Sequence, residues 1–159
     1  MLKTQPLPLS DAVGARTSVL NHTTLEVFRQ VCGLELVNDP HADWTCQPVI
    51  HATMDIAGDE SALLLVALPE EVAIGMAQRL AGFDVPFDGR DMTHAMEDLT
   101  LILADHLRAR LRHKGINITL SAPVVERGEG EILPVPYRYV KRVMLASGLG
   151  PVLVGILER

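Results

Sequence analysis

The sequence predicts an α+β fold in two layers, with long helices packed on one face of an antiparallel sheet. Three segments repeat apolar residues with helical spacing, whereas others alternate or are continuously apolar in the manner of strands. The strand segments are joined by short turns, which suit antiparallel pairing. With 159 residues, 48% of them apolar and 21% charged, the chain has the composition of one globular domain, residues 1–159. The expected order is α-β-β-α-α-β-β-β.

The first third of the chain is predicted to hold a helix and a β-hairpin. Residues 1–15, with two prolines and a glycine, are expected to form an extended or mobile lead-in. A helix follows over 21–32, where apolar residues form one stripe. Residues 49–57 alternate strictly, with an apolar face and a face open to water, and 62–68 are almost entirely apolar. The turn between them makes the pair a hairpin.

Two helices are predicted in the middle of the chain. Pro69 and Glu70 open the first, because proline and acidic residues suit the first turn, and Gly82 ends it. Asp91 is a candidate cap for the second and longest helix, which ends near Gly115.

The rest of the chain is predicted to be strand. The candidate segments are 116–125, 137–147 and 151–158, with a loop over 126–136 and a turn at Gly148–Pro151.

Charge and composition exclude several classes of function. Residues 39–105 contain thirteen acidic and two basic residues, so this acidic section would repel a phosphate backbone and nucleic acid is an unfavourable partner. No apolar run is long enough to span a bilayer, and no secretory leader is visible. Cys32 and Cys46 form no disulfide framework and are expected to be reduced thiols. We therefore expect a cytoplasmic protein without a membrane partner.

The long helix has three distinct faces when each residue is turned by about 100° from the one before. The apolar face contains Met96, Leu99, Leu103 and Leu107. The opposite face, expected in water, contains His94, Asp98 and Asp105. The flank between them contains Glu97, Thr100, Leu101, Ala104 and Arg108. Small and apolar residues beside a carboxylate suit the docking of another protein, although an ordinary surface glutamate would also fit.

The ordered set of elements carries a resemblance to a known family. It consists of the helix "TTLEVFRQVCGLEL", the strand "HATMDIAGD", and residues 63–111 with their leucine-rich strand, Pro-Glu-Glu helix start and long helix. This set resembles the CheX branch of the CheC/CheX/FliY chemotaxis phosphatases and covers most of the chain from about residue 20. The resemblance implies a CheC-like fold.

The resemblance also implies a function. Members of the family carry Glu-x-x-Asn on the long helix and hydrolyse the aspartyl-phosphate of a CheY-like response regulator. The glutamate pairs with a lysine of the receiver domain, and the asparagine aligns a water for in-line attack. The receiver already holds Mg²⁺, so no metal or other cofactor is expected to be bound by this chain.

Carried over by position, Glu97 and Thr100 are the expected catalytic pair. Glu97, Leu101, Ala104 and Arg108 are the expected partner-binding residues. Threonine departs from the family asparagine, because its side chain is shorter, stiff at its first torsion, and able to bond the carbonyl one turn back.

Three functions therefore stay open at this point. The first is a CheX-like phosphatase, and the second is a non-catalytic module that binds or sequesters a receiver. The third is a homodimerising structural subunit of a signalling or flagellar assembly.

Two further expectations concern metals and assembly. His94 and Glu97 have ligand-like spacing, but no other histidine or cysteine motif completes a site, so no metal site is expected. The resemblance implies a homodimer formed through sheet edges. The sparsely charged C-terminal segment 144–158 is the expected edge.

Overall fold

The computed structural model describes residues 17–41, 48–58, 62–129 and 138–158. The expected lead-in over residues 1–15 and Cys46 lie outside these ranges, as does most of the expected loop over 126–136.

Three helices and seven strands make up the described chain. The helices are α2 (Thr17–Cys32), α3 (Glu70–Ala81) and α4 (Arg90–His113). The strands are β1 (Val37–Asn38), β2 (Pro48–Ala57), β3 (Ala62–Pro69), β4 (Thr119–Leu120), β5 (Val124–Glu129), β6 (Arg138–Ser147) and β7 (Gly150–Glu158). All the strand pairs are antiparallel. The predicted α+β class is confirmed.

The strands form one sheet in the order β1-β6-β7-β3-β2-β4, and β5 also pairs with β2. Strand β7 lies between β6 and β3, so the expected sheet edge over residues 144–158 is wrong for Gly150–Glu158, which is the larger part of that segment. Low charge marks a strand buried inside a sheet as readily as an open one, which is why the sequence pattern misled us. The edges of the described sheet are β1 with β6 on one side and β4 with β5 on the other.

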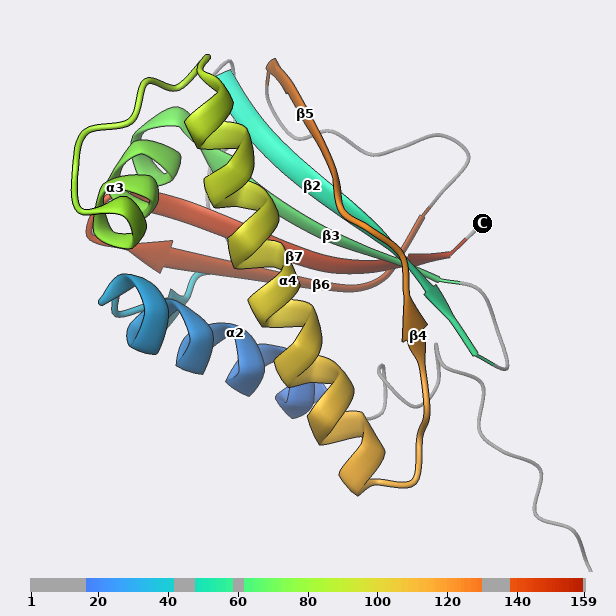
Figure 1. The fold of residues 1–159 in the computed structure, drawn as a ribbon. Coiled ribbons are helices and arrows are strands. Elements are labelled where there is room, and N and C mark those ends of the chain that lie inside the picture. Colours follow the sequence, from blue (N-terminus) through green and yellow to red (C-terminus); the bar gives the residue numbers. More distant parts are fainter. Residues whose placement is uncertain (1–16, 42–47, 59–61, 130–137, 159) are drawn as a thin grey trace, which may run out of the picture.

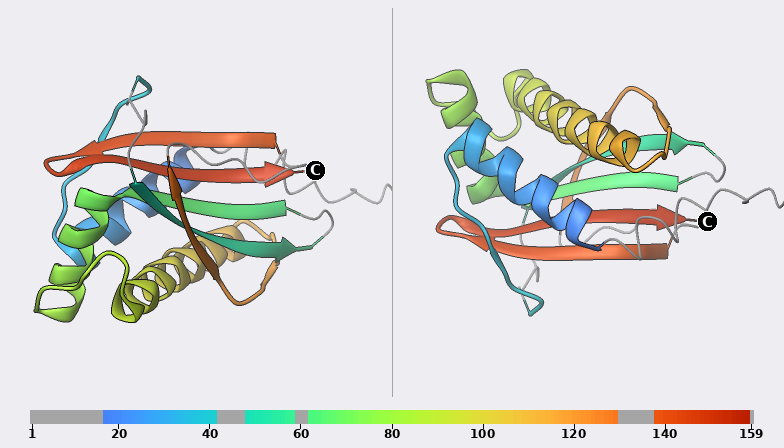
Figure 2. Two further views of the ribbon diagram at one scale, coloured as in Figure 1. Left: turned by 90° about the horizontal axis from the view of Figure 1, so that it is seen from above. Right: turned by 90° about the horizontal axis from the view of Figure 1, so that it is seen from below.

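The helices all cover the same face of the sheet, as two views of the ribbon show (Figures 1 and 2). The strand alternation explains this two-layer arrangement. In β3, Leu64, Val66 and Leu68 belong to the main core beneath the helices. Leu63 and Leu65 belong to a second buried cluster, which they share with residues of β2, β6 and β7. Because successive side chains point to opposite faces of a strand, this second cluster lies on the other face of the sheet.

The hairpin of β2 and β3 is confirmed, but one face of β2 is drier than the sequence predicted. Asp55 is exposed, as expected for a face in water. His51, four residues earlier on the same face of β2, is buried. A histidine in an alternating strand therefore did not mark a solvent face here.

Several boundaries differ from the predictions. Helix α2 begins at Thr17 instead of residue 21, and the short strand β1 was not predicted. Helix α4 begins at Arg90 after the N-cap Gly89, which makes no side-chain cap, and Asp91 lies in the first turn instead of capping it. The predicted strand 116–125 is divided into β4 and β5, and β5 continues to Glu129 through residues that we expected in a loop. The charged residues of β5 led us to predict a loop, but an edge strand also tolerates charged residues. The predicted end of α3 is confirmed, since Gly82 has a φ of 81°.

Candidate functional site

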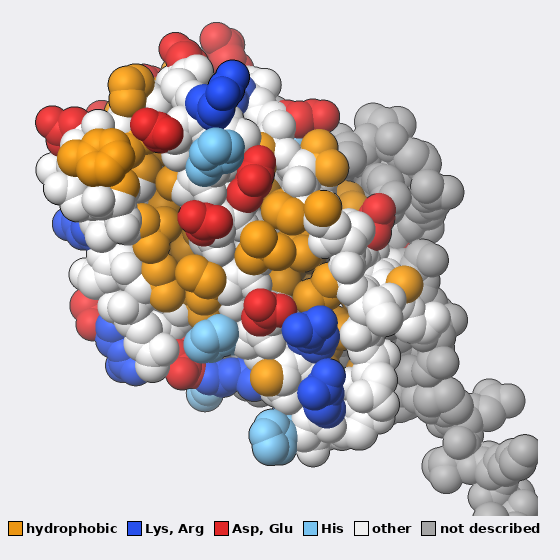
Figure 3. Space-filling view, in the orientation of Figure 1, with side chains coloured by type: hydrophobic (Ala, Val, Ile, Leu, Met, Phe, Trp, Pro, Cys, Tyr) orange, Lys and Arg blue, Asp and Glu red, His pale blue; other side chains and the backbone are white. Residues whose placement is uncertain are grey.

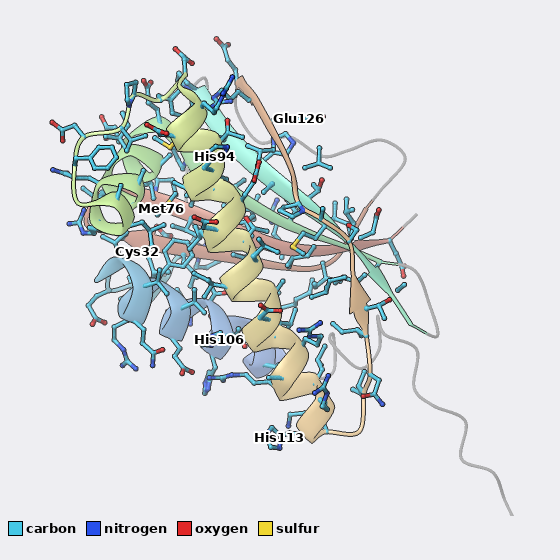
Figure 4. The ribbon with its side chains drawn as sticks, in the orientation of Figure 1. Cys32, Met76, His94, His106, His113 and Glu126 are labelled. Carbon is cyan, nitrogen blue, oxygen red and sulfur yellow. The ribbon has the colours of Figure 1, made fainter. Side chains whose placement is uncertain are left out.

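Helix α4 carries the candidate site, and its buried stripe fixes how it lies on the sheet. All four predicted core residues are fully buried: Met96, Leu99, Leu103 and Leu107. His94, Asp98 and Asp105 are exposed, as predicted. Figure 4 shows His94, His106 and His113 at successive levels along this helix, with Glu126 on the neighbouring strand β5.

Thr100 does not lie on an accessible flank. Its side chain is fully buried, and its hydroxyl donates a hydrogen bond of 2.7 Å to the carbonyl of Met96, one turn back in the helix. A hydroxyl committed in this way has no free donor for a water in a partner's active site. The expectation of an accessible Thr100 is therefore wrong.

The other flank residues divide into a buried and an exposed set. Ala104 is fully buried, so it cannot be a partner-binding residue on the surface of this chain. Leu101 has 40% of its surface exposed. Glu97 is partly exposed, and the Arg108 side chain is 41% exposed. Three of the five predicted residues thus share an accessible surface.

The charges on this surface are mostly acidic. Arg108 forms an ion pair of 3.0 Å with Asp105 on its own helix, so its charge is partly compensated. Among the described residues, Glu97 has no hydrogen-bond or ion-pair partner. Figure 3 shows hydrophobic side chains gathered around α4 with acidic side chains among them. Such a surface suits a partner with an apolar centre and basic groups.

The shape of the site favours a macromolecular partner. Two clefts of the described chain lie between α2 and the C-terminal part of α4. A third is lined by Asn21, Pro40 and residues of β1 and β6. Neither Glu97 nor Leu101 lines any of these three clefts. The candidate surface is thus the outer side of a helix, which suits contact with another folded surface.

Arg127 is a residue of this region that the sequence analysis did not single out. It lies on β5, in a segment predicted to be loop, and its guanidinium hydrogen-bonds the start of α4 and the loop before it. Only the pairing of β5 with β2 brings Arg127 to this place, directly opposite Ile50.

Two buried groups elsewhere offer no comparable chemistry. Burial raises the pKa of the Cys32 thiol to about 11, although Arg79 opposes the shift, so this thiol is protonated and unreactive near neutral pH. Burial lowers the pKa of His51, while Glu126 acts in the opposite direction. Within the described ranges, no three histidine, cysteine or acidic residues are grouped as a metal site would require.

Comparisons with known proteins come from structure alone. The sequence matches no protein-family model and no curated protein. The fold superposes on CheX from Vibrio vulnificus with a TM-score of 0.76 at 16% identity, covering 89% of this chain and 95% of that one. A CheC-like protein from Shewanella sp. PV-4 gives a TM-score of 0.75 at 14% identity, covering 96% of this chain and all of that one. The chain has a CheC-like fold.

One structure that shares the CheC-like fold is a complex. It is a CheX–CheY–BeF₃–Mg²⁺ assembly from Borrelia burgdorferi, with a TM-score of 0.63 at 13% identity over 89% of this chain and 95% of that one. At such identities the likeness concerns the fold, so function must be argued from the residues of α4. None of the helices in the described chain is long and apolar enough to cross a bilayer.

Proposed function

We propose that this chain binds a CheY-like response regulator through α4 and has little or no phosphatase activity of its own. One observation carries the proposal: the carboxylate of Glu97 is accessible and unpaired among the described residues, whereas the hydroxyl of Thr100 is buried and bonded to Met96. The surface thus keeps a group that can bind a partner and lacks the neighbouring group that would place a water.

The choice of partner rests on chemistry and on the shared fold. A carboxylate beside the exposed Leu101 can pair with a lysine at the rim of a receiver's active site while the leucine packs against apolar surface. The CheX–CheY complex has a similar fold in its CheX chain, which supports a receiver as the partner. In this proposal the receiver supplies the Mg²⁺.

A phosphatase is the second candidate, because the resemblance assigns Glu97 to the position of the family glutamate. Hydrolysis would require Thr100 to release the carbonyl of Met96 and turn outward, and the burial of its whole side chain opposes this. Since water alignment contributes entropy and electrostatic stabilisation at the reacting phosphorus, a group that cannot reach the water contributes neither.

The test measures binding and hydrolysis in the same samples. A receiver from the same organism is loaded with beryllofluoride and Mg²⁺ for binding by calorimetry, and phosphorylated for a decay assay. We expect saturable binding together with decay that this chain leaves unchanged or slows. Accelerated decay that depends on Thr100 would establish the phosphatase instead, and absence of binding to both receiver forms would refute the proposal.

Assembly and location complete the proposal. We propose a cytoplasmic homodimer that uses a sheet edge other than β7. Within the described chain, β1 pairs with β6 only at Leu145 and Ala146, so most of the outer side of β6 has no strand from that range beside it. A dimer mass in light scattering at micromolar concentration is the expected result, and a monomer mass would contradict it.

A further inference from the structure

Arg127 on strand β5 holds the start of α4 through an unusually complete set of contacts. Its Nε donates to the carbonyl of Phe87 at 3.1 Å. Its Nη2 donates to the carbonyl of Gly89 and to the hydroxyl of Thr93, both at 3.0 Å. The guanidinium carbon also lies 5.8 Å from the centroid of the Phe87 ring. An exposed arginine is thus fixed by three hydrogen bonds and a cation–π contact.

The start of α4 needs such support, because its own capping is weak. Gly89 is the N-cap and offers no side chain to the free N–H groups of the first turn. The first bond of the helix, from the N–H of Thr93 to the carbonyl of Gly89, is 3.4 Å long, near the limit of a hydrogen bond. Arg127 cannot cap these N–H groups, because a guanidinium only donates. It instead tethers the start of the helix to β5, since it binds the carbonyl of Gly89 and the hydroxyl of Thr93.

The residues held by Arg127 are in line with the proposed docking surface. Thr93, Glu97 and Leu101 are spaced by four residues, which places them one above another on the same side of the helix. A shift at Thr93 therefore moves Glu97 by a similar amount, because one helical turn is stiff. Strand β5 is in turn anchored to the sheet by its pairing with β2.

We propose that Arg127 is the positioning residue of the receiver-docking surface, fixing the N-terminal half of α4 and hence Glu97 against the sheet. It acts through Gly89 and Thr93 and does not itself touch the receiver. This inference rests on the proposed function, and it predicts that losing the guanidinium weakens receiver binding even though Glu97 and Leu101 are unchanged.

The experiment compares three variants by hydrogen exchange and by receiver binding. Arg127→Gln removes the charge and the forked donor, and Arg127→Lys keeps the charge but loses the fork. Arg112→Gln removes the same charge from the exposed last turn of α4 and is the matched control. Exchange is followed by mass spectrometry on peptides covering residues 82–97, with α2 as internal reference. Binding to the beryllofluoride-loaded receiver is measured at low and high salt, after urea unfolding confirms that each variant is folded.

We expect Arg127→Gln to speed exchange at residues 90–97 about tenfold and to weaken receiver binding about tenfold, as the loss of charged hydrogen bonds would predict. Arg127→Lys should recover part of both effects, and Arg112→Gln should show neither. The weakening should be equal at both salt concentrations, since a contact charge would give a salt-dependent loss.

The outcomes separate this inference from the function on which it rests. If the unaltered protein binds the receiver and Arg127→Gln binds equally well, Arg127 is not a positioning residue, whatever happens to exchange. A loss of binding that shrinks at high salt would make Arg127 a direct contact and would also overturn the inference. If the unaltered protein does not bind the receiver, the proposed function itself fails, and the role of Arg127 in docking fails with it.

Discussion

The hydroxyl of Thr100 donates to the carbonyl of Met96 at 2.7 Å, which turns the side chain back onto its own helix. Thr23 and Thr24 of α2 make the same kind of bond to Val19 and Leu20. In all three cases a buried threonine satisfies its hydroxyl without a partner from another element. Thr100 therefore resembles a structural residue of a helix interior, and Glu97 is the accessible member of the expected pair.

The first prediction concerns Thr100→Asn. Position 100 is fully buried, so an asparagine amide there should reach a receiver's water no better than the hydroxyl does. This variant should therefore leave the decay of a phosphorylated receiver unchanged, and it should lower the free energy of unfolding in urea by about 1–3 kcal/mol because it places an amide in the core. The measurement is phosphate release at fixed receiver concentration with Mg²⁺. Thr100→Val is the control, because it removes only the hydroxyl, and it should leave binding and decay as they are. A loss of hydrolysis in Thr100→Val would show that the hydroxyl is catalytic after all.

The second prediction concerns Glu97→Gln. Removing a carboxylate that pairs with a lysine across an interface should weaken receiver binding by about 1–2 kcal/mol, or roughly five- to thirtyfold. The matched control is Asp98→Asn, which removes an equal charge from the next residue, on the face of α4 turned away from this flank. Calorimetry at two salt concentrations should show a loss for Glu97→Gln alone. Equal losses for both variants would mean that the receiver senses only the net charge of the helix.

The sequence was sufficient to predict the fold class, because the spacing of apolar residues shows whether a segment is a helix or a strand and which side of it is buried. The stripe of Met96, Leu99, Leu103 and Leu107 has a helical period, and the alternation in β2 has a strand period, so each of these two elements has one apolar side to bury. The spacing of apolar residues could not predict how much of the circumference of α4 is buried by neighbouring elements. Helix α4 packs beside β2 and β5 as well as the other helices, and Thr100 and Ala104 fall inside the buried part of its circumference.

The position of Arg127 beside the start of α4 could not be predicted from the sequence for a related reason. Strand β5 has the charged composition of a loop, and its identity as a strand comes from pairing with β2, about 75 residues earlier in the chain. A contact between Arg127 and the start of α4 depends on that pairing and on the path of the loop before α4. Neither is encoded in a local pattern of residues.

The third prediction concerns the contact between α3 and the turn joining β6 to β7. A Cβ added at Gly75 would overlap Leu149 Cδ1, so Gly75→Ala should lower the free energy of unfolding by about 1 kcal/mol despite the better helix propensity of alanine. In a Leu149→Ala background that overlap is gone and only Arg79 Nη1, 3.3 Å from the added Cβ, must give way, so the same substitution should be about 1 kcal/mol more favourable than in the unaltered protein. Urea unfolding of the four proteins measures both values. A destabilisation of equal size in both backgrounds would show that Leu149 is not the obstacle.

The fourth prediction concerns the acid sensitivity of His51. The imidazole is 3% exposed, its Nε2 lies 3.6 Å from Glu126 Oε2, and its Nδ1 has no partner among the described residues. Burial lowers its pKa from the ordinary 6.5, and Glu126 partly restores it. Because the folded pKa lies below the unfolded one, the unfolded chain binds the proton first as pH falls. His51 therefore contributes stability above pH 6.5 that is lost as pH falls through its folded pKa.

Glu126→Gln removes the opposing charge, so the pKa of His51 in the folded protein should fall further and the loss of stability in acid should grow. The effect is modest, because Glu126 is mostly exposed and water screens its charge: about 0.5 kcal/mol at pH 5.5 and close to zero at pH 8. Urea unfolding at the two pH values gives the difference. Glu129→Gln, an exposed residue on the same strand, is the control and should show no such change with pH. In a His51→Leu background, which binds no proton at this position, the pH-dependent part of the Glu126→Gln effect should disappear, and its persistence there would assign the acid sensitivity to another group.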